Sequence, residues 1–172
     1  MFLIHEKIII CQSSMFYFTV LFGIGTFITV CSCCCQNGWT RFNDSCYLIG
    51  YGQNVTFIEA EHYCRQHNGH LIHVNTAEEN LFIVDILQKT KAYHSWVGIS
   101  DMDVEGIWQW YDTSQKPDFT YWYPGEPNGG QHEDCGVYAV HHDYKWSDYP
   151  CDSNLHPICE TSTDVVDSII GK

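Results

Sequence analysis

Basic residues are scarce in this chain, which has 8 Lys and Arg against 21 Asp and Glu and a formal net charge of −13. Proteins that bind nucleic acid neutralise phosphates with clustered Lys and Arg, so we exclude nucleic acid as a partner. Internal repeats, low-complexity tracts, collagen-like glycine repeats and heptad segments are also missing. A homo-oligomer would therefore have to form through surface contacts or spare cysteines, and not through a collagen or coiled-coil stalk.

Closely spaced cysteine pairs are missing from most of the chain, although cysteine itself is abundant. The six cysteines from residue 35 onward contain no C-x-x-C pair, which favours a disulfide framework over a zinc site. They are Cys35, Cys46, Cys64, Cys135, Cys151 and Cys159. Their spacing alone does not choose between the many pairings that six cysteines allow. Disulfides indicate an oxidising compartment, and 172 residues are enough for one domain with a substantial core.

Charge is absent from residues 8–36, most of which are apolar or small. This stretch predicts a secretory signal peptide over residues 1–34, or a signal anchor that stays in the membrane. An anchor would press Cys35 against the bilayer with no stalk, so we favour cleavage near Cys31-Ser32-Cys33. The expected product is then secreted and extracellular, with membrane contact only if this segment is uncleaved. A cysteine of this region that survives cleavage could form a disulfide to another chain.

Turn residues and a capping box organise the start of the domain. Residues 36–51 place Gly, Asn and Asp between aromatic and aliphatic residues, a pattern that predicts a β-hairpin. Thr56 and Glu59 then form a capping box, which predicts the start of a helix. Asn68-Gly69 predicts where this helix ends.

A second capping box, formed by Thr76 and Glu79, predicts another helix. We expect this helix to end before Thr90. Its apolar residues Leu81, Val84 and Leu87 recur at helical spacing, so we expect them to form its buried face.

After the second helix the pattern changes to short strands. Strands are expected at residues 96–99, 107–110, 137–140, 144–146 and 158–160. Two helices followed by several short strands predict an α+β domain over residues 35–160, with a short tail at 161–172. A long loop is expected over residues 112–132. The tryptophans expected in the core are Trp96, Trp108, Trp110 and Trp146.

Carboxylates and amides gather in and after this loop, in the segments Glu126-Pro127-Asn128, Glu133-Asp134-Cys135 and Trp146-Ser147-Asp148. Calcium takes six to eight oxygen ligands from carboxylates, amide carbonyls and water, so these segments predict a calcium site. The alternative is an acidic surface without an ion. No catalytic set is visible, since Ser147 lacks the glycine pattern of a nucleophile elbow, and we expect a binding protein and not an enzyme.

Two sequons, at Asn43 and Asn54, are candidates for N-glycosylation in a secreted protein. Chance matches to this short pattern are common. Asn43 also has Cys46 close by, and this neighbour is a reason to expect that the sequon is occluded.

An ordered set of short motifs resembles the C-type lectin domain. The motifs are Asn37-Gly38-Trp39 after Cys35, Cys64 in the first helix, Gly69-His70-Leu71, Trp96-Val97-Gly98-Ile99, Glu126-Pro127-Asn128, Glu133-Asp134-Cys135, Trp146-Ser147-Asp148 and Cys159. The resemblance covers residues 35–160 and implies the C-type lectin fold, with two helices packed on short antiparallel strands. It also implies three disulfides, Cys35 with Cys46, Cys64 with Cys159, and Cys135 with Cys151.

The resemblance implies that one calcium ion sits in the long loop and binds two adjacent hydroxyls of a sugar. Its implied metal ligands are Glu126, Asn128, Glu133, Ser147 and Asp148, and the implied carbohydrate-binding residues are Glu126, Asn128, Glu133 and Asp148. Pro127 would be cis. The Glu-Pro-Asn sequence implies mannose-type sugars, whereas Gln-Pro-Asp would imply galactose. Related domains usually have Asn where this chain has Ser147, so we expect a weaker or altered site.

An auxiliary calcium site is implied by Asp101, Glu105, Glu133 and Asp134. Gly129 stands where related domains often place Asp or Asn, so one ligand of this site is missing.

The sequence thus predicts a secreted, calcium-dependent lectin for mannose, N-acetylglucosamine, glucose or fucose, plausibly in recognition of microbial or self glycans. Two alternatives remain open. One is a type II membrane receptor with the same domain, and the other is a structural or matrix protein with this fold that binds protein, mineral or ice.

Overall fold

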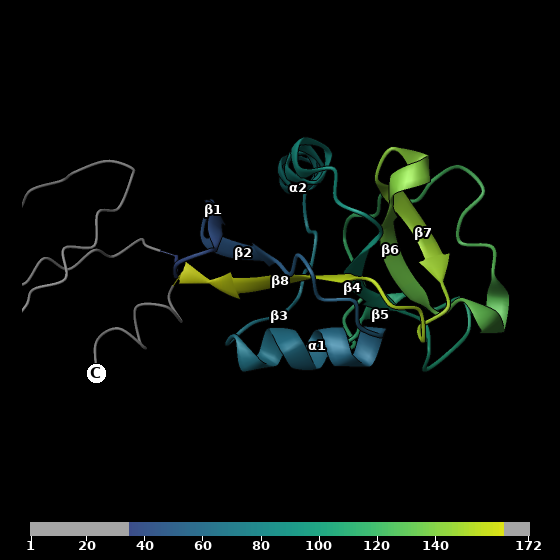
Figure 1. Cartoon of the computed structure of the whole chain (residues 1–172). Helices are drawn as coiled ribbons and strands as arrows, with labels where there is room; N and C mark the ends of the chain where they lie inside the picture. The colour runs from purple at the N-terminus through teal and green to yellow at the C-terminus, as the bar shows by residue number, and fades with distance from the viewer. Residues whose placement is uncertain (1–34, 164–172) are drawn as a thin grey trace, which may run out of the picture.

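The computed structural model describes residues 35–163, and Figure 1 shows how they are arranged. The proposed signal segment and most of the expected tail lie outside the described residues. The helices of the described part are α1 (Phe57–Gln66), α2 (Ala77–Thr90) and the short 3-10 helices η1 (Gly130–His132) and η2 (Val140–His142). The strands are β1 (Thr40–Phe42), β2 (Ser45–Ile49), β3 (His70–Leu71), β4 (Ser95–Ser100), β5 (Gln109–Trp110), β6 (Cys135–Ala139), β7 (Lys145–Tyr149) and β8 (His156–Ser162).

Strand β8 joins the two halves of the sheet. It pairs antiparallel with β2 and β3 and parallel with β4, so the main order is β1-β2-β8-β4-β6-β7. Strands β5 and β6 both pair antiparallel with β4, and β7 pairs antiparallel with β6. In Figure 1 the β6–β7 hairpin and the long loop lie at one end of the molecule, and the β1–β2 hairpin lies at the other. The predicted α+β class is confirmed.

Helix α1 begins as the sequence predicts. The Thr56 side chain accepts a hydrogen bond from the Glu59 N–H, and the Glu59 carboxylate accepts one from the Thr56 N–H (3.0 Å). The helix ends at Gln66, and Asn68 adopts a positive φ of 60° just beyond it. The buried residues Phe57, Ala60 and Cys64 lie at helical spacing, so α1 packs its apolar face against the sheet.

Helix α2 differs from the sequence expectation in its buried face. Val84 and Leu87 are buried as expected, but Leu81 is 63% exposed, and Asn80 is buried beside Ile83. The Tyr138 hydroxyl donates to Asn80 Oδ1 (3.0 Å). This bond satisfies an amide that would otherwise be costly to bury, so Asn80 takes the place in the buried face that was expected for Leu81.

The ends of α2 also differ in detail from the expectation. The Thr76 side chain caps the helix as predicted, but the Glu79 carboxylate accepts from the Asn75 N–H (2.8 Å) and the Tyr47 hydroxyl (2.6 Å). The helix includes Thr90, and Lys91 follows in the left-handed conformation. The helix is therefore longer than expected.

Two apolar clusters form the core. One contains Ile83, Val84 and Leu87 of α2, and the other contains Phe57, Ala60 and Cys64 of α1. Figure 1 agrees, because α1 and α2 lie on opposite sides of strand β8. Three of the expected core tryptophans are buried, namely Trp96, Trp110 and Trp146, whereas Trp108 is half-buried and packs edge-on against Trp122.

Several strand boundaries were predicted only in part. The expected strand at residues 107–110 is reduced to β5, because Ile107 is 56% exposed and precedes the pairing with β4. Val140 begins η2 instead of ending β6, and Tyr144 has a positive φ of 59° that excludes it from β7. Strand β8 is longer than residues 158–160, and its end takes Thr161 and Ser162 from the expected tail. Strand β3 was not predicted.

The three disulfides of the structure join Cys35 to Cys46, Cys64 to Cys159, and Cys135 to Cys151, as the resemblance implies. The Cys64–Cys159 bridge spans 95 residues and ties α1 to β8. The Cys135–Cys151 bridge holds the start of β6 to the segment after β7, at the end of the molecule that carries the acidic loop. Both sequon asparagines, Asn43 and Asn54, are exposed, and their glycosylation stays a prediction.

The two leucines of α2 provide a matched test of its corrected buried face. Leu87 is fully buried, so Leu87→Ala should lower the free energy of unfolding by about 2–5 kcal/mol through lost burial and a cavity. Leu81→Ala should change it by less than about 0.5 kcal/mol because that side chain is exposed. Urea unfolding of both variants measures the difference. Equal destabilisation by the two substitutions would contradict this orientation of the helix.

Candidate metal centre in the long loop

The acidic loop is fastened to strand β7 by one carboxylate. Asp148 is 3% exposed, and its Oδ2 accepts hydrogen bonds from the backbone N–H groups of Asn128 (2.8 Å) and Gly129 (2.6 Å). The Glu126–Pro127 peptide bond just before them is cis, as the resemblance implies. One oxygen of Asp148, Oδ2, therefore anchors the loop, and Oδ1 takes no part in these two bonds.

Three carboxylates come together at this point. Burial, the close side-chain contact with Asp148 and the negative charges of Asp148 and Glu133 together raise the pKa of Glu126 to about 7. Burial and the charge of Asp148 also raise the pKa of Glu133, which His132 partly offsets. These shifts have the cause expected for like charges held close together in a partly buried site. Among the described residues, His132 is the cation that acts on this group, and it offsets the charge only in part.

The Oδ1 atom of Asp148 indicates which kind of ligand the cluster can bind. It is buried without a hydrogen-bond partner among the described residues. A buried, unpaired carboxylate oxygen is costly, whereas a cation held between Asp148 and its acidic neighbours would satisfy it and relieve their repulsion. Carboxylate and amide oxygens are the ligands that calcium prefers. The residues present therefore fit calcium, and Glu126, Asn128, Glu133 and Asp148 would hold it.

A second acidic group borders the first. Asp101 is 3% exposed; its Oδ2 accepts from the Gly106 N–H (2.8 Å), and its Oδ1 is buried without a partner in the described part of the chain. Loss of hydration and nearby negative charges raise the pKa values of Asp101 and Glu105. The charges of Asp134 and Asp148 act on both residues. The structure thus places Asp101, Glu105 and Asp134 near one another, whereas Glu133 interacts with Asp148, and the auxiliary site stays a prediction.

Gly129 limits this auxiliary group. A Cβ at this position would overlap the side chain of Glu133, so the close approach of Glu133 requires glycine here. An Asp or Asn ligand at the same position would displace Glu133. The missing auxiliary ligand and the placement of Glu133 therefore have one cause.

Ser147 takes part in a contact that the sequence analysis did not anticipate. Its side chain is buried, and Oγ lies 2.8 Å from His142 Nδ1. The His142 ring stacks on Tyr123 at 3.7 Å and 9°. His142 and Ser147 are only five residues apart in the sequence. Their contact depends on the irregular turn between η2 and β7, and the sequence does not reveal the conformation of that turn. The ligand role of Ser147 stays a prediction.

The loop cluster can now be compared with known proteins. Residues 53–161 match the family model described as "Lectin C-type domain". A perlucin-like protein of Mytilus galloprovincialis is 31% identical over 123 residues, covering 70% of this chain and 78% of that protein. This chain belongs to the C-type lectin domain family. Human C-type lectin domain family 10 member A is 35% identical over 134 residues, but these make up only 40% of that relative.

Solved structures with this C-type lectin fold differ in what their descriptions report. A calcium-independent type II antifreeze protein has a TM-score of 0.69 and 31% identity, covering 76% of this chain and 95% of that one. The cow carbohydrate-recognition domain of CD23, solved in the presence of GlcNAc2Man3 oligosaccharide, has a TM-score of 0.64 and 33% identity, with 76% and 97% covered. The family therefore includes sugar-binding and calcium-independent members.

Among residues 35–163, no helix combines the length and apolar character needed to cross a bilayer.

The raised pKa of Glu126 predicts how the stability of the calcium-free lectin domain depends on pH. The folded-state pKa of about 7 exceeds the ordinary value of 4.5, so the folded protein holds the extra proton between these two pH values. Stability should therefore fall as pH rises through this window. Glu126→Gln cannot titrate and should flatten the slope. Thermal unfolding in chelator, followed across the window, measures this, and an unchanged slope in Glu126→Gln would contradict the proposed crowding of charge.

Proposed function

We propose that this C-type lectin domain belongs to a secreted, calcium-dependent lectin that binds mannose-type sugars. The observation that carries the proposal is the unpartnered Asp148 Oδ1, held beside Glu126 and Glu133 by a loop that the same residue anchors. An acidic surface without an ion would keep its carboxylates apart and hydrated. Here they are crowded and partly buried, which favours a cation.

Sugar recognition would use the outer edge of the same cluster. Bound calcium would supply a positive centre to which two neighbouring hydroxyls of a sugar coordinate. The Glu126 carboxylate accepts hydrogen bonds from hydroxyl protons, and the Asn128 amide donates to hydroxyl oxygens. Asn128 is exposed and Glu126 is half-buried, so both can reach a ligand from solvent. The cis bond at Pro127 redirects the chain between them.

The order of acceptor and donor around Pro127 carries the sugar preference. Glu126 followed by Asn128 presents an acceptor first and a donor second, the arrangement that the resemblance links to mannose, N-acetylglucosamine, glucose and fucose. The likeness to the CD23 domain solved with a GlcNAc2Man3 oligosaccharide supports this direction. A single shallow site typically binds a monosaccharide with a dissociation constant of about 1 mM, or about −4 kcal/mol. Tight retention would need several sites on one particle.

Secretion and a role in glycan or pathogen recognition are part of the proposal and rest on the N-terminal segment and the disulfides. Sequencing the N-terminus of the product released by a secretory host distinguishes it from a membrane receptor. A released product that begins near residue 35 supports secretion, and retention of the apolar segment in membranes favours the receptor.

A second candidate function follows from the contact between Ser147 and His142. If Ser147 keeps this hydrogen bond, it contributes nothing to the metal, and the calcium-independent antifreeze protein is then the better guide. The domain would bind a protein, mineral or ice surface through another face. A glycan array run with calcium and with chelator separates the two functions.

Affinity chromatography on immobilised mannan and galactose tests the sugar preference directly. The protein should be retained by mannan in calcium and released by EGTA. The double substitution Glu126→Gln with Asn128→Asp reverses donor and acceptor and should move retention from mannan to galactose. Asp152→Asn is the control, because Asp152 is exposed and lies outside the loop cluster. Retention by mannan that EGTA leaves unchanged, or unchanged mannose selectivity in the double variant, would overturn the proposal.

A further inference from the structure

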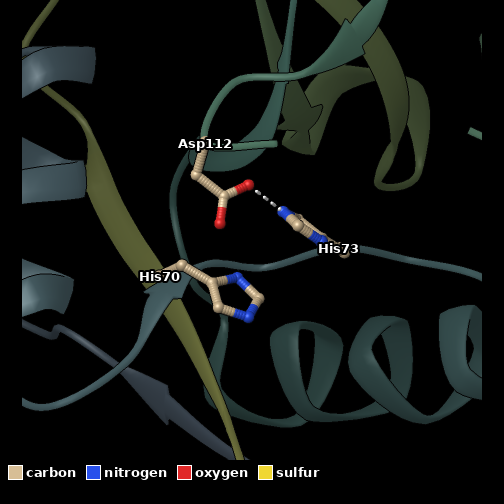
Figure 2. Close-up of side chains that lie close together, drawn as sticks. All are labelled: His70, His73 and Asp112. Atoms are coloured by element: carbon tan, nitrogen blue, oxygen red, sulfur yellow. Dashed lines mark hydrogen bonds and ion pairs between the residues drawn. The ribbon is translucent and has the colours of Figure 1, made fainter. Parts of the chain in front are cut away.

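A second set of metal-ligating side chains lies away from the calcium cluster and shares no residue with it. His70, His73 and Asp112 each offer a ligand atom, and these three atoms lie within 4.8 Å of one another. Figure 2 shows the His70 ring and the Asp112 carboxylate turned toward the same space beside His73. His70 is in β3, His73 follows that strand, and Asp112 comes just after β5.

Each of the three side chains is oriented by a specific contact. His73 Nε2 lies 2.7 Å from Asp112 Oδ1, and the His73 ring stacks on Trp110 at 4.6 Å and 15°. His70 Nδ1 lies 2.8 Å from the carbonyl oxygen of Leu71. Such contacts from a backbone carbonyl or an aromatic ring fix the orientation of imidazole ligands in metal sites. The side chains of His73 and Asp112 are 15% and 9% exposed, so both belong to a partly desolvated site.

The surrounding charges leave room for a cation. Arg65 Nη2 contacts Asp112 Oδ2 at 3.2 Å, while its Nε contacts Glu61 Oε1 at 2.6 Å. Arg65 therefore contacts Oδ2 of Asp112 and not the Oδ1 atom that faces His73. The charge of Arg65 is also neutralised by Glu61. Burial alone would raise the pKa of Asp112, but the His73 hydrogen bond and the charges of His73, His70 and Arg65 together lower it.

The site also has an opening. A surface cavity of about 460 Å³ borders His70, and its other lining residues are Arg65, Asn68, Gly69, Thr161 and Ser162. His73 and Asp112 do not line this cavity, so it borders the group at His70 alone. Three protein ligands leave a position of a tetrahedral ion for water.

The ligand types select the class of metal. Two imidazoles with one carboxylate suit zinc and neighbouring late transition metals, whereas calcium requires an all-oxygen shell. Ligand atoms around a tetrahedral zinc ion lie about 3.3 Å apart, given zinc–ligand distances of about 2.0–2.1 Å. The present separations bracket this value, since His73 Nε2 and Asp112 Oδ1 lie 2.7 Å apart and all three ligand atoms lie within 4.8 Å of one another. The His70 and His73 rings lie 4.3 Å apart at 38°, close enough for both to contribute to one site.

We propose that His70, His73 and Asp112 form a zinc site beside Arg65 and Trp110, distinct from the calcium cluster. The interpretation that competes with it is a purely structural His73–Asp112 hydrogen bond packed on Trp110. That interpretation leaves the approach of His70 without a role, whereas a three-ligand site uses all three side chains. The proposal does not depend on the proposed sugar binding.

Calorimetric titration of the full chain with zinc chloride, in excess calcium, tests the site by comparing three proteins. Excess calcium fills the oxygen-rich loop cluster. His70→Gln removes one ligand and should weaken one zinc-binding event at least about tenfold, since even outer-shell partners of metal ligands typically contribute about 10- to 100-fold. His141→Gln is the matched control, because His141 is exposed and packs against His94 and His142 in another histidine group. All three proteins contain the same cysteines outside the described residues. Zinc bound by those cysteines therefore contributes equally to each titration and does not affect the comparison.

Loss of the event in His70→Gln with its retention in His141→Gln supports the site. Equal zinc binding by the wild type and His70→Gln, or loss only in His141→Gln, overturns it. If His70→Gln does not fold, diffraction of wild-type crystals at the zinc absorption edge decides. An anomalous peak between His70, His73 and Asp112 supports the proposal, and a peak elsewhere or no peak overturns it.

Discussion

Two backbone N–H groups that donate to one oxygen of Asp148 hold the functional end of this molecule together. They join the long loop to strand β7 and fix where Glu126, Asn128 and Glu133 can lie. Strand β7 is in turn fixed by its pairing with β6, and the Cys135–Cys151 bridge ties the start of β6 to the segment beyond β7. The loop has little regular structure of its own, so its geometry depends on this carboxylate. The same anchor leaves Asp148 Oδ1 buried and available to an ion.

The anchor has an electrostatic consequence. Folding brings Glu126 and Glu133 against Asp148, which raises the pKa values of both glutamates and makes the calcium-free loop costly at neutral pH. A cation bound there favours the folded loop because it binds only the assembled cluster. Calcium binding and loop order are therefore expected to be coupled. Ser147 stands where related domains usually have Asn. Its hydroxyl contacts His142 near the hairpin turn, although the resemblance implies that this hydroxyl is a calcium ligand.

Local signals were readable from the sequence, and long-range ones were not. The capping residues Thr56 and Thr76 act within one helical turn, and both helices begin where they predict. The buried face of α2 could not be predicted, because Asn80 is buried only through a bond to Tyr138, 58 residues away. The resemblance supplied the disulfide pairs and the loop ligands. It gave no indication of the Ser147–His142 contact, or of the meeting of His73 with Asp112 across 39 residues.

The domain thus carries two separate groups of candidate metal ligands, the carboxylates around Asp148 and the group of His70, His73 and Asp112. The central claim concerns the first, and a crystal structure of the protein grown with calcium tests it most directly. We expect a calcium ion at about 2.3–2.6 Å from oxygens of Glu126, Asn128 and Asp148, with Asp148 Oδ1 among its ligands. A calcium-saturated crystal in which this cluster holds no ion, or in which the ion binds without Asp148, would contradict the account.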